Sequence, residues 1–178
     1  GSYLLFLHDD TEVITPDWLQ CMLECSQDEN VGAVGAKLLF PDGRLQHVGI
    51  AVPGANPKHL CYGAPRETPG YFNSNVVHRN YSAVSGACLL TRAEVFRALG
   101  GFTTAFPRGY GDIDYCLKVV ASGKRVVYTP YAQLYHHEAG SKNGTPQHEL
   151  AEFQSRWADK CADDRYYPTL AQIAALGW

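Results

Sequence analysis

The sequence predicts an α/β fold in which one sheet is flanked by helices. Its first stretch, residues 3–7, is a run of five apolar or aromatic residues, typical of a strand buried on both faces. Further apolar runs alternate with segments in which apolar residues repeat at helical spacing. The chain has 178 residues, of which 46% are hydrophobic, so it can bury a sizeable core, and we expect a single domain over residues 1–178.

Charge and cysteine usage exclude several classes of protein. The 15 Lys and Arg residues and 18 Asp and Glu residues give a formal charge of −3, and no basic stripe favours nucleic acid as a partner. No apolar run reaches the length of a transmembrane segment. The six cysteines form no Cys-x-x-Cys pair, so we interpret them as reduced core residues of a cytosolic protein rather than as a disulfide framework or a zinc site.

The first strand runs directly into His8, Asp9 and Asp10. In open α/β sheets, ligands bind beyond the carboxyl ends of the strands. Two adjacent carboxylates repel each other, and a hard divalent ion would offset that repulsion. The alternative is that both carboxylates only cap the turn and the helix that follows. A buried strand at this position also favours a missing N-terminal part, unless later strands flank it.

Residues 15–52 predict a helix and a hairpin. Thr15 is a plausible N-cap with Pro16 at the first helical position, and the apolar spacing carries this helix to about Ser26. Residues 31–40 form the next strand, a Pro-Asp-Gly turn follows, and residues 45–52 return as the hairpin partner. We interpret this hairpin as a side structure, away from the chemistry.

Residues 53–80 are rich in Pro, Gly, Asn, His and Tyr and have no periodicity, which is typical of a functional or disordered connection. Four aromatic residues could offer flat faces and hydroxyl groups to a sugar: Tyr62, Tyr71, Phe72 and Tyr81. The alternative is that these side chains anchor the connection to the core.

A strand over residues 82–90 and a helix over residues 92–99 come next. Gly86 interrupts the strand, at a position where a ligand or another backbone can approach closely. Gly100 and Gly101 end the helix.

A second glycine-rich segment opens the next helix, which Gly123 ends. Asp112 lies at its N-cap or in its first turn, and Asp114 follows. The helix dipole favours carboxylates at this end, so a structural role is expected for one of the two. The flanking glycines favour an additional role for the pair.

The late part of the chain predicts two short strands, residues 125–128 and 133–135, separated by Pro130. The second strand leads into His136 and His137, and imidazoles together with carboxylates form a competent ligand set for manganese or magnesium. A last helix over residues 146–161 packs on the body, and a short helix is expected in the tail from residue 166.

These motifs, in this order, resemble the C-terminal half of a family 2 glycosyltransferase with the GT-A fold. The subgroup they look most like is the rhamnosyltransferase-like enzymes of bacterial surface polysaccharide synthesis. The resemblance covers residues 3–138. The matching stretches are residues 4–13, 84–92, 96–102, 111–118 and 127–137.

The resemblance implies a GT-A-type mixed sheet that lacks the nucleotide-binding half, and it implies roles for particular residues. Asp10 would bind Mn²⁺ or Mg²⁺, together with His136 or, as the fallback, His137. Asp9 would contact the ribose or sugar of the donor, or the metal through water. The backbone at Gly86 and Ala87 would line the pocket for the donor sugar. Asp112 would be the general base, and Asp114 would orient the acceptor or cap the helix. The chain departs from the family pattern at His8, Gly111 and Thr103-Thr104, each of which stands where relatives often have acidic residues.

The function implied is metal-dependent, inverting transfer of a sugar from a UDP-, dTDP- or GDP-sugar to a glycan or lipid-linked acceptor. The location implied is cytoplasmic, with peripheral association at the inner face of the membrane. Because the base-binding half is absent, we expect residues 1–178 alone to bind nucleotide sugar weakly and turn over little. Two alternatives are a non-catalytic glycan-binding module and a metal-dependent hydrolase that uses His136, His137 and Glu138.

Overall fold

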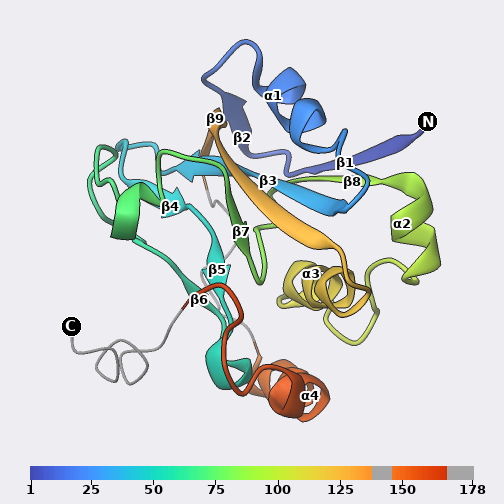
Figure 1. The fold of residues 1–178 in the computed structure, drawn as a ribbon. Helices are drawn as coiled ribbons and strands as arrows, with labels where there is room; N and C mark the ends of the chain where they lie inside the picture. The colour runs from blue at the N-terminus through green and yellow to red at the C-terminus, as the bar shows by residue number, and fades with distance from the viewer. Residues whose placement is uncertain (138–145, 168–178) are drawn as a thin grey trace.

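The computed structural model describes residues 1–137 and 146–167, which form a mixed sheet with helices on both faces (Figure 1). The main strand order is β1-β8-β3-β9-β2, with β4 paired to β3 and β7 paired to β9. The strands are β1 (Tyr3–Leu7), β2 (Thr11–Val13), β3 (Val31–Leu39), β4 (Leu45–His47), β7 (Arg79–Tyr81), β8 (Cys88–Arg92) and β9 (Arg125–His136). The α/β prediction is therefore confirmed.

The centre of the sheet is the parallel pair β3 and β9. Every residue of β3 is buried, as expected for a strand covered on both faces. The prediction of two short strands separated by Pro130 is wrong, because β9 is continuous. The register of β9 against β3 shifts between Thr129 and Gln133, and this irregularity accommodates Pro130, which has no amide hydrogen to donate.

The first strand lies elsewhere than predicted. Within the described residues, β1 is at the edge of the sheet and pairs only with β8. Its two faces are nevertheless both in contact with apolar side chains: Leu5 packs with one core cluster and Phe6 with the other. A run of apolar residues indicates that both faces of a strand are covered, but it does not indicate how many other strands pair with it.

The helices divide between the two faces of the sheet (Figure 1). On one face, α1 (Trp18–Cys25) contributes Met22 to a core with residues of β3, β8 and β9. On the other face lie α2 (Ala93–Ala98) and α3 (Gly111–Ala121), with α4 (Gln147–Trp157) packed beyond α3. These bounds agree closely with the predicted helices, except that α1 begins three residues after its predicted cap.

The hairpin after β3 is confirmed in part, because β4 pairs with β3 in antiparallel register. Ile50 and Ala51, at the end of the predicted partner strand, instead pair with residues 58–59 in a separate sheet. Short elements fill the connection that follows: β5 (Ile50–Ala51), η1 (Pro53–Ala55), β6 (Lys58–His59) and η2 (Tyr71–Asn73). The predicted strand over residues 82–90 begins only at Cys88, because the chain before it turns aside and Ala83 pairs with Ile50 instead. A final turn, η3 (Ala158–Lys160), follows α4.

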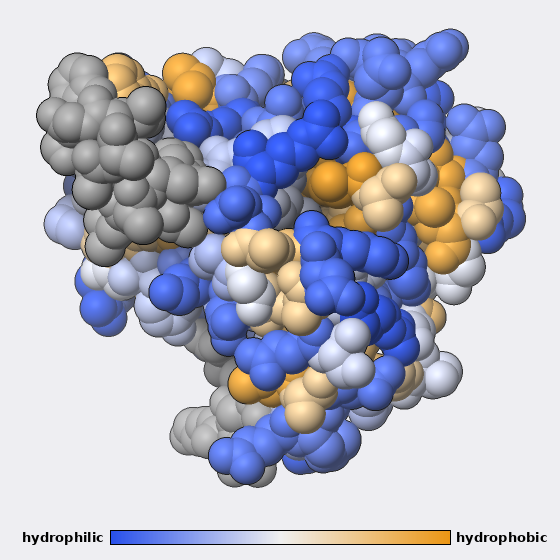
Figure 2. Space-filling view, turned by 60° about the horizontal axis from the view of Figure 1, so that its bottom comes forward, coloured by the Kyte–Doolittle hydropathy of each residue, from blue (hydrophilic) through white to orange (hydrophobic). Residues whose placement is uncertain are grey.

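All six cysteines are free, and burial raises the pKa of the Cys88 thiol to about 12. No helix among the described residues is both long and apolar enough to span a bilayer. On the face shown in Figure 2, hydrophilic residues predominate and hydrophobic residues form small groups. Glu138 and the tail helix predicted from residue 166 onward lie outside the described residues, except for the first two residues of that tail.

Candidate active site

Three side chains that could ligate a metal meet at one end of the sheet: His8, Asp10 and His136. One potential ligand atom from each lies within 4.8 Å of the other two. His136 Nε2 is 3.1 Å from Asp10 Oδ1 and 3.2 Å from His8 Nδ1. The His136 side chain is only 12% exposed, whereas that of His8 is 57% exposed. The cluster is therefore open to solvent on the His8 side.

The backbone holds these three residues together. The His8 amide donates to the Ala87 carbonyl at 3.0 Å, and the Thr11 hydroxyl donates to the His8 carbonyl at 2.7 Å, which closes the turn after β1. Pairing of β2 with β9 then sets Thr11 opposite His136. The geometry of the cluster thus follows from strand register and from one turn.

The donor set suits a divalent transition ion. Two imidazole nitrogens and one carboxylate oxygen form a mixed nitrogen and oxygen site, which manganese accepts. The His136 nitrogen faces both a carboxylate oxygen and a second imidazole nitrogen, so these atoms are close enough to bind one cation together. The residues present therefore fit the metal that the sequence implied.

Two residues assigned to this region lie outside the cluster. The side chain of His137 points away from it, and its Nε2 lies 3.5 Å from Glu12 Oε2. Asp9 is exposed in the turn and is not among the three grouped residues. His8, by contrast, joins the cluster although it was treated only as a departure from the family pattern. An imidazole can replace a carboxylate as a metal ligand, so a histidine where relatives have an acidic residue could have indicated this role.

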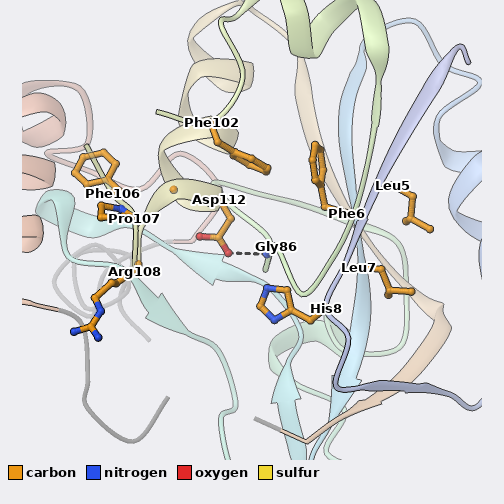
Figure 3. Close-up of a pocket in the computed structure, with 12 residues that line it drawn as sticks. Leu5, Phe6, Leu7, His8, Gly86, Phe102, Phe106, Pro107, Arg108 and Asp112 are labelled. Carbon is orange, nitrogen blue, oxygen red and sulfur yellow. Dashed lines mark hydrogen bonds between the residues drawn. The ribbon is translucent and has the colours of Figure 1, made fainter. Parts of the chain in front are cut away.

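Asp112 lies in the first turn of α3 and points into a cavity (Figure 3). Its Oδ2 accepts a hydrogen bond from the Gly86 amide at 2.6 Å, and its Oδ1 accepts one from the Ile113 amide at 2.9 Å. Gly86 permits this approach because a Cβ at position 86 would lie 2.9 Å from the Cβ of Asp112. The carboxylate is therefore fixed by two backbone amides.

Two cavities meet at Asp112. One, of about 580 Å³, is lined by residues that include His8, Gly86 and Phe102. The other, of about 360 Å³, is lined by Gln46, His47, Pro57, His59, Tyr62, Ser85, Tyr110, Ile113 and His136. Both also include Arg108, Gly109 and Asp112 in their walls. The end of β1, the start of α3 and the end of β9 thus converge on one cleft.

Ala87, which was expected to line the donor pocket, lies in neither cavity wall. Its carbonyl instead accepts a hydrogen bond from the His8 amide.

The structure corrects the expectation for Asp114, which is fully buried and faces α4 rather than either cavity. Its carboxylate accepts hydrogen bonds from Trp157 Nε1 at 3.0 Å and from Arg156 Nη1 at 3.2 Å, and it pairs with Lys118 Nζ at 2.7 Å. Residues two apart on a helix point in directions about 200° apart, so Asp112 and Asp114 cannot face the same cleft. Asp114 fastens α3 to α4.

Several residues of the cleft were missed because they come from elements assigned no chemistry. Gln46 and His47 belong to the hairpin that was interpreted as a side structure, yet both line the smaller cavity. Burial, with His59 and His136 nearby, lowers the pKa of His47 well below its ordinary value. The buried Glu149 of α4 accepts hydrogen bonds from the amides of Gly109 at 3.0 Å and Arg108 at 3.4 Å, which pins the loop at the cavity wall.

Comparison with known proteins identifies relatives of much greater length. No protein-family model matches the sequence. The chain is 42% identical to an uncharacterized protein, y4gI, of Sinorhizobium fredii, with 96% of the chain and 20% of that protein covered. It is 37% identical to the O-antigen biosynthesis protein RfbC of Myxococcus xanthus, with 98% of the chain and 14% of that protein covered. The chain therefore spans a fifth or less of the length of these relatives.

A third relative and two solved structures are similar to the chain at lower identity. The chain is 26% identical to the N-acetylglucosaminyl-diphospho-decaprenol L-rhamnosyltransferase of Mycobacterium tuberculosis, over 76% of the chain and 47% of that protein. GalNAc-T7, solved with UDP, GalNAc and Mn²⁺, matches 92% of the chain and is itself covered over 33%, with a TM-score of 0.65 and 15% identity. The mannosyltransferase PcManGT from Pyrobaculum calidifontis, in complex with GDP-Man and Mn²⁺, matches 99% of the chain. The match covers 50% of PcManGT, with a TM-score of 0.51 and 16% identity.

These similarities confirm the resemblance that the motifs indicated. The chain has the fold of the GT-A glycosyltransferases. Its sequence relatives include an O-antigen biosynthesis protein and a rhamnosyltransferase, in agreement with the rhamnosyltransferase-like subgroup.

Proposed function

We propose that this chain is the catalytic core of a metal-dependent glycosyltransferase of bacterial surface polysaccharide synthesis. It would transfer a sugar from a nucleotide sugar to a hydroxyl group of a glycan or lipid-linked acceptor. The observation that carries the proposal is the common cleft of Asp112, His8 and His136: Asp112 lines a cavity with each of the two histidines. A base and a metal cluster that share a cleft can serve the attacking and the leaving group of one reaction.

His8, Asp10 and His136 would hold the ion, with Mn²⁺ or Mg²⁺ as the candidates. When bound, the ion supplies Lewis-acid neutralisation of the leaving diphosphate. The protein's own contribution is to keep two imidazoles and a carboxylate within reach of one point, through the turn after β1 and the pairing of β2 with β9. The Mn²⁺ in GalNAc-T7 and PcManGT supports the choice of ion.

Asp112 would accept the proton of the attacking hydroxyl group. A positioned general base contributes about 10²–10⁴-fold to such a reaction. The amides of Gly86 and Ile113 hold the carboxylate in place, so its orientation does not depend on mobile side chains. Within the described residues, Asp112 is the one carboxylate in the walls of the two cavities, which favours a single displacement and inversion at the sugar.

The donor and the acceptor follow from the same cleft. Gly86 lines the larger cavity, and Asp9 is exposed beside the cluster, so both are proposed to contact the donor, a UDP-, dTDP- or GDP-sugar. Ala87 would act through its hydrogen bond to His8. We infer a cytoplasmic reaction with peripheral association at the membrane, because a lipid-linked acceptor would lie at the membrane surface. We also infer that residues 1–178 alone bind nucleotide sugar weakly, because the resemblance places the base-binding half of the family outside these residues.

The test is to incubate a full-length protein that contains this chain with Mn²⁺ and a panel of nucleotide sugars, with and without acceptor glycans. Transfer that requires an acceptor supports the proposal. Hydrolysis of the nucleotide sugar at the same rate without acceptor would indicate the hydrolase, and glycan binding without any turnover would indicate a binding module. The control for Asp112→Asn is Asp163→Asn, because Asp163 is an exposed carboxylate that lines neither of the two cavities.

A further inference from the structure

Gln46 of β4 touches the candidate metal ligand His136 with both ends of its side-chain amide. Its Oε1 lies 2.7 Å from His136 Nδ1, and its Nε2 donates to the His136 carbonyl at 3.3 Å. Gln46 is 4% exposed, so neither contact is readily replaced by water. The two residues are 90 positions apart in the chain, and the hairpin of β3 and β4 brings them together.

The second of these contacts fixes the orientation of the amide. A backbone carbonyl can only accept a hydrogen bond, so the amide atom next to the His136 carbonyl must be the nitrogen. The atom next to His136 Nδ1 is then the amide oxygen, which can only accept. The Gln46 amide therefore has one orientation, with Nε2 toward the His136 carbonyl and Oε1 toward His136 Nδ1.

This arrangement fixes the imidazole as well. Because Gln46 Oε1 accepts, His136 Nδ1 must carry the hydrogen, and in the neutral ring Nε2 then carries the lone pair. Nε2 is the atom that faces Asp10 Oδ1 and His8 Nδ1. A hydrogen bond on the far nitrogen is how proteins orient an imidazole that ligates a metal.

We propose that Gln46 is a positioning residue that holds His136 in the Nδ1–H tautomer and aims its Nε2 lone pair at the metal position. The metal part of this inference rests on the proposed function, whereas the tautomer does not. It also gives the hairpin a role in the cleft, since β4 supplies a side chain that orients His136.

The test compares three variants of the chain. Gln46→Met keeps the length of the side chain and removes both hydrogen bonds. Gln46→Glu keeps an oxygen acceptor for Nδ1–H. Gln133→Met is the matched control, because Gln133 lies three residues before His136 on β9 and bonds to Arg66 and the Pro130 carbonyl instead. Thermal unfolding checks that each variant folds.

Two readouts are made. Long-range ¹H–¹⁵N spectra of the metal-free chain at pH 8 report the tautomer of His136, and electron paramagnetic resonance of free Mn²⁺ reports the Kd. We expect Nδ1–H in the wild type, a mixture of tautomers in Gln46→Met, and a Kd for Mn²⁺ that rises about 10–100-fold in that variant. Gln46→Glu should restore the tautomer and bring the Kd to within about threefold of wild type, and Gln133→Met should change neither by more than about twofold.

The outcomes separate the two proposals. An unchanged tautomer in Gln46→Met, or an unchanged Kd in a wild type that does bind Mn²⁺, would overturn the role of Gln46. If the wild type bound no Mn²⁺ but Gln46→Met still altered the tautomer, the metal site of the proposed function would fail and the control of the ring by Gln46 would be supported. Should Gln46→Met not fold, the comparison of Gln46→Glu with the wild type decides, since loss of the Nδ1–H tautomer there would contradict the inference.

Discussion

The carboxylate of Asp112 and the amide of Gly86 are joined by a hydrogen bond of 2.6 Å, which ties the first turn of α3 to the segment before β8. The carboxylate can approach this closely because Gly86 has no side chain to separate its amide from the Asp112 side chain. The position of the proposed base Asp112 therefore depends on Gly86, although the two residues are 26 positions apart in the chain.

Gly86→Ala tests whether the contact with Gly86 positions Asp112. The added Cβ would lie 2.9 Å from the Asp112 Cβ and 3.2 Å from its Oδ2, so the carboxylate must shift. We expect sugar transfer to fall about 10²-fold, as for a misplacement of about 1 Å in a reacting group, with a loss of about 1–3 kcal/mol in the free energy of unfolding. Initial rates and chemical denaturation measure the two effects. Gly100→Ala is the control, because it adds backbone strain at φ +74° in open space and should lower stability without lowering the rate.

Asp114→Asn should act on stability. The carboxylate is fully buried and bonded to Trp157, Arg156 and Lys118, so its loss weakens the attachment of α3 to α4. We expect the free energy of unfolding to fall by about 3 kcal/mol, the lower end for breaking a buried ion pair. Glu152→Gln, which removes the exposed partner of Arg156, should change it little. Equal effects of the two variants in urea denaturation would contradict this account.

The two neighbouring histidines should differ in Mn²⁺ binding. His136 faces Asp10 and His8, whereas His137 lies against Glu12 on the outside of the strand. We expect His136→Ala to abolish measurable Mn²⁺ binding and His137→Ala to leave the Kd within about twofold, because successive residues of a strand point to opposite faces. Titration calorimetry distinguishes them, and an equal loss in both variants would show that the cluster is assigned wrongly.

His47 makes stability depend on pH. Its pKa is well below the ordinary value of 6.5 in the folded chain, so below pH 6.5 the unfolded chain binds a proton that the folded chain does not. The free energy of unfolding should therefore fall as the pH decreases from 6.5. In His47→Gln this dependence should be weaker between pH 7 and 5, by denaturant unfolding at each pH. His148→Gln, on the exposed side of α4, should keep the wild-type dependence.

The elements of the cleft could be predicted from the sequence because each carries a local signal. The apolar run before His8 marks a strand, and the glycines before Asp112 mark the start of a helix. The order of these motifs indicated that they meet, and both line the larger cavity.

The direction in which particular side chains point could not be predicted, because it depends on strand register and on packing. The sequence leaves open whether His136 or His137 turns inward, and only the pairing of β2 with β9 decides it. Gln46 was missed for the same reason, since the irregular register of β4 on β3 sets the face on which it lies. Asp114 was misassigned because its partners on α4 are about 40 residues away in the chain.

The central claim is that the metal cluster and Asp112 serve one reaction, and Asp112→Asn in a full-length protein that contains this chain tests it most directly. The measurement is the rate of sugar transfer in the presence of saturating Mn²⁺, together with the Kd for Mn²⁺ of the same protein. We predict a rate at least about 10²-fold below wild type with the Kd unchanged within about threefold, and no wild-type transfer after chelation of the metal. An Asp112→Asn protein that transfers sugar at the wild-type rate, or a chelated wild type that stays active, would contradict the account.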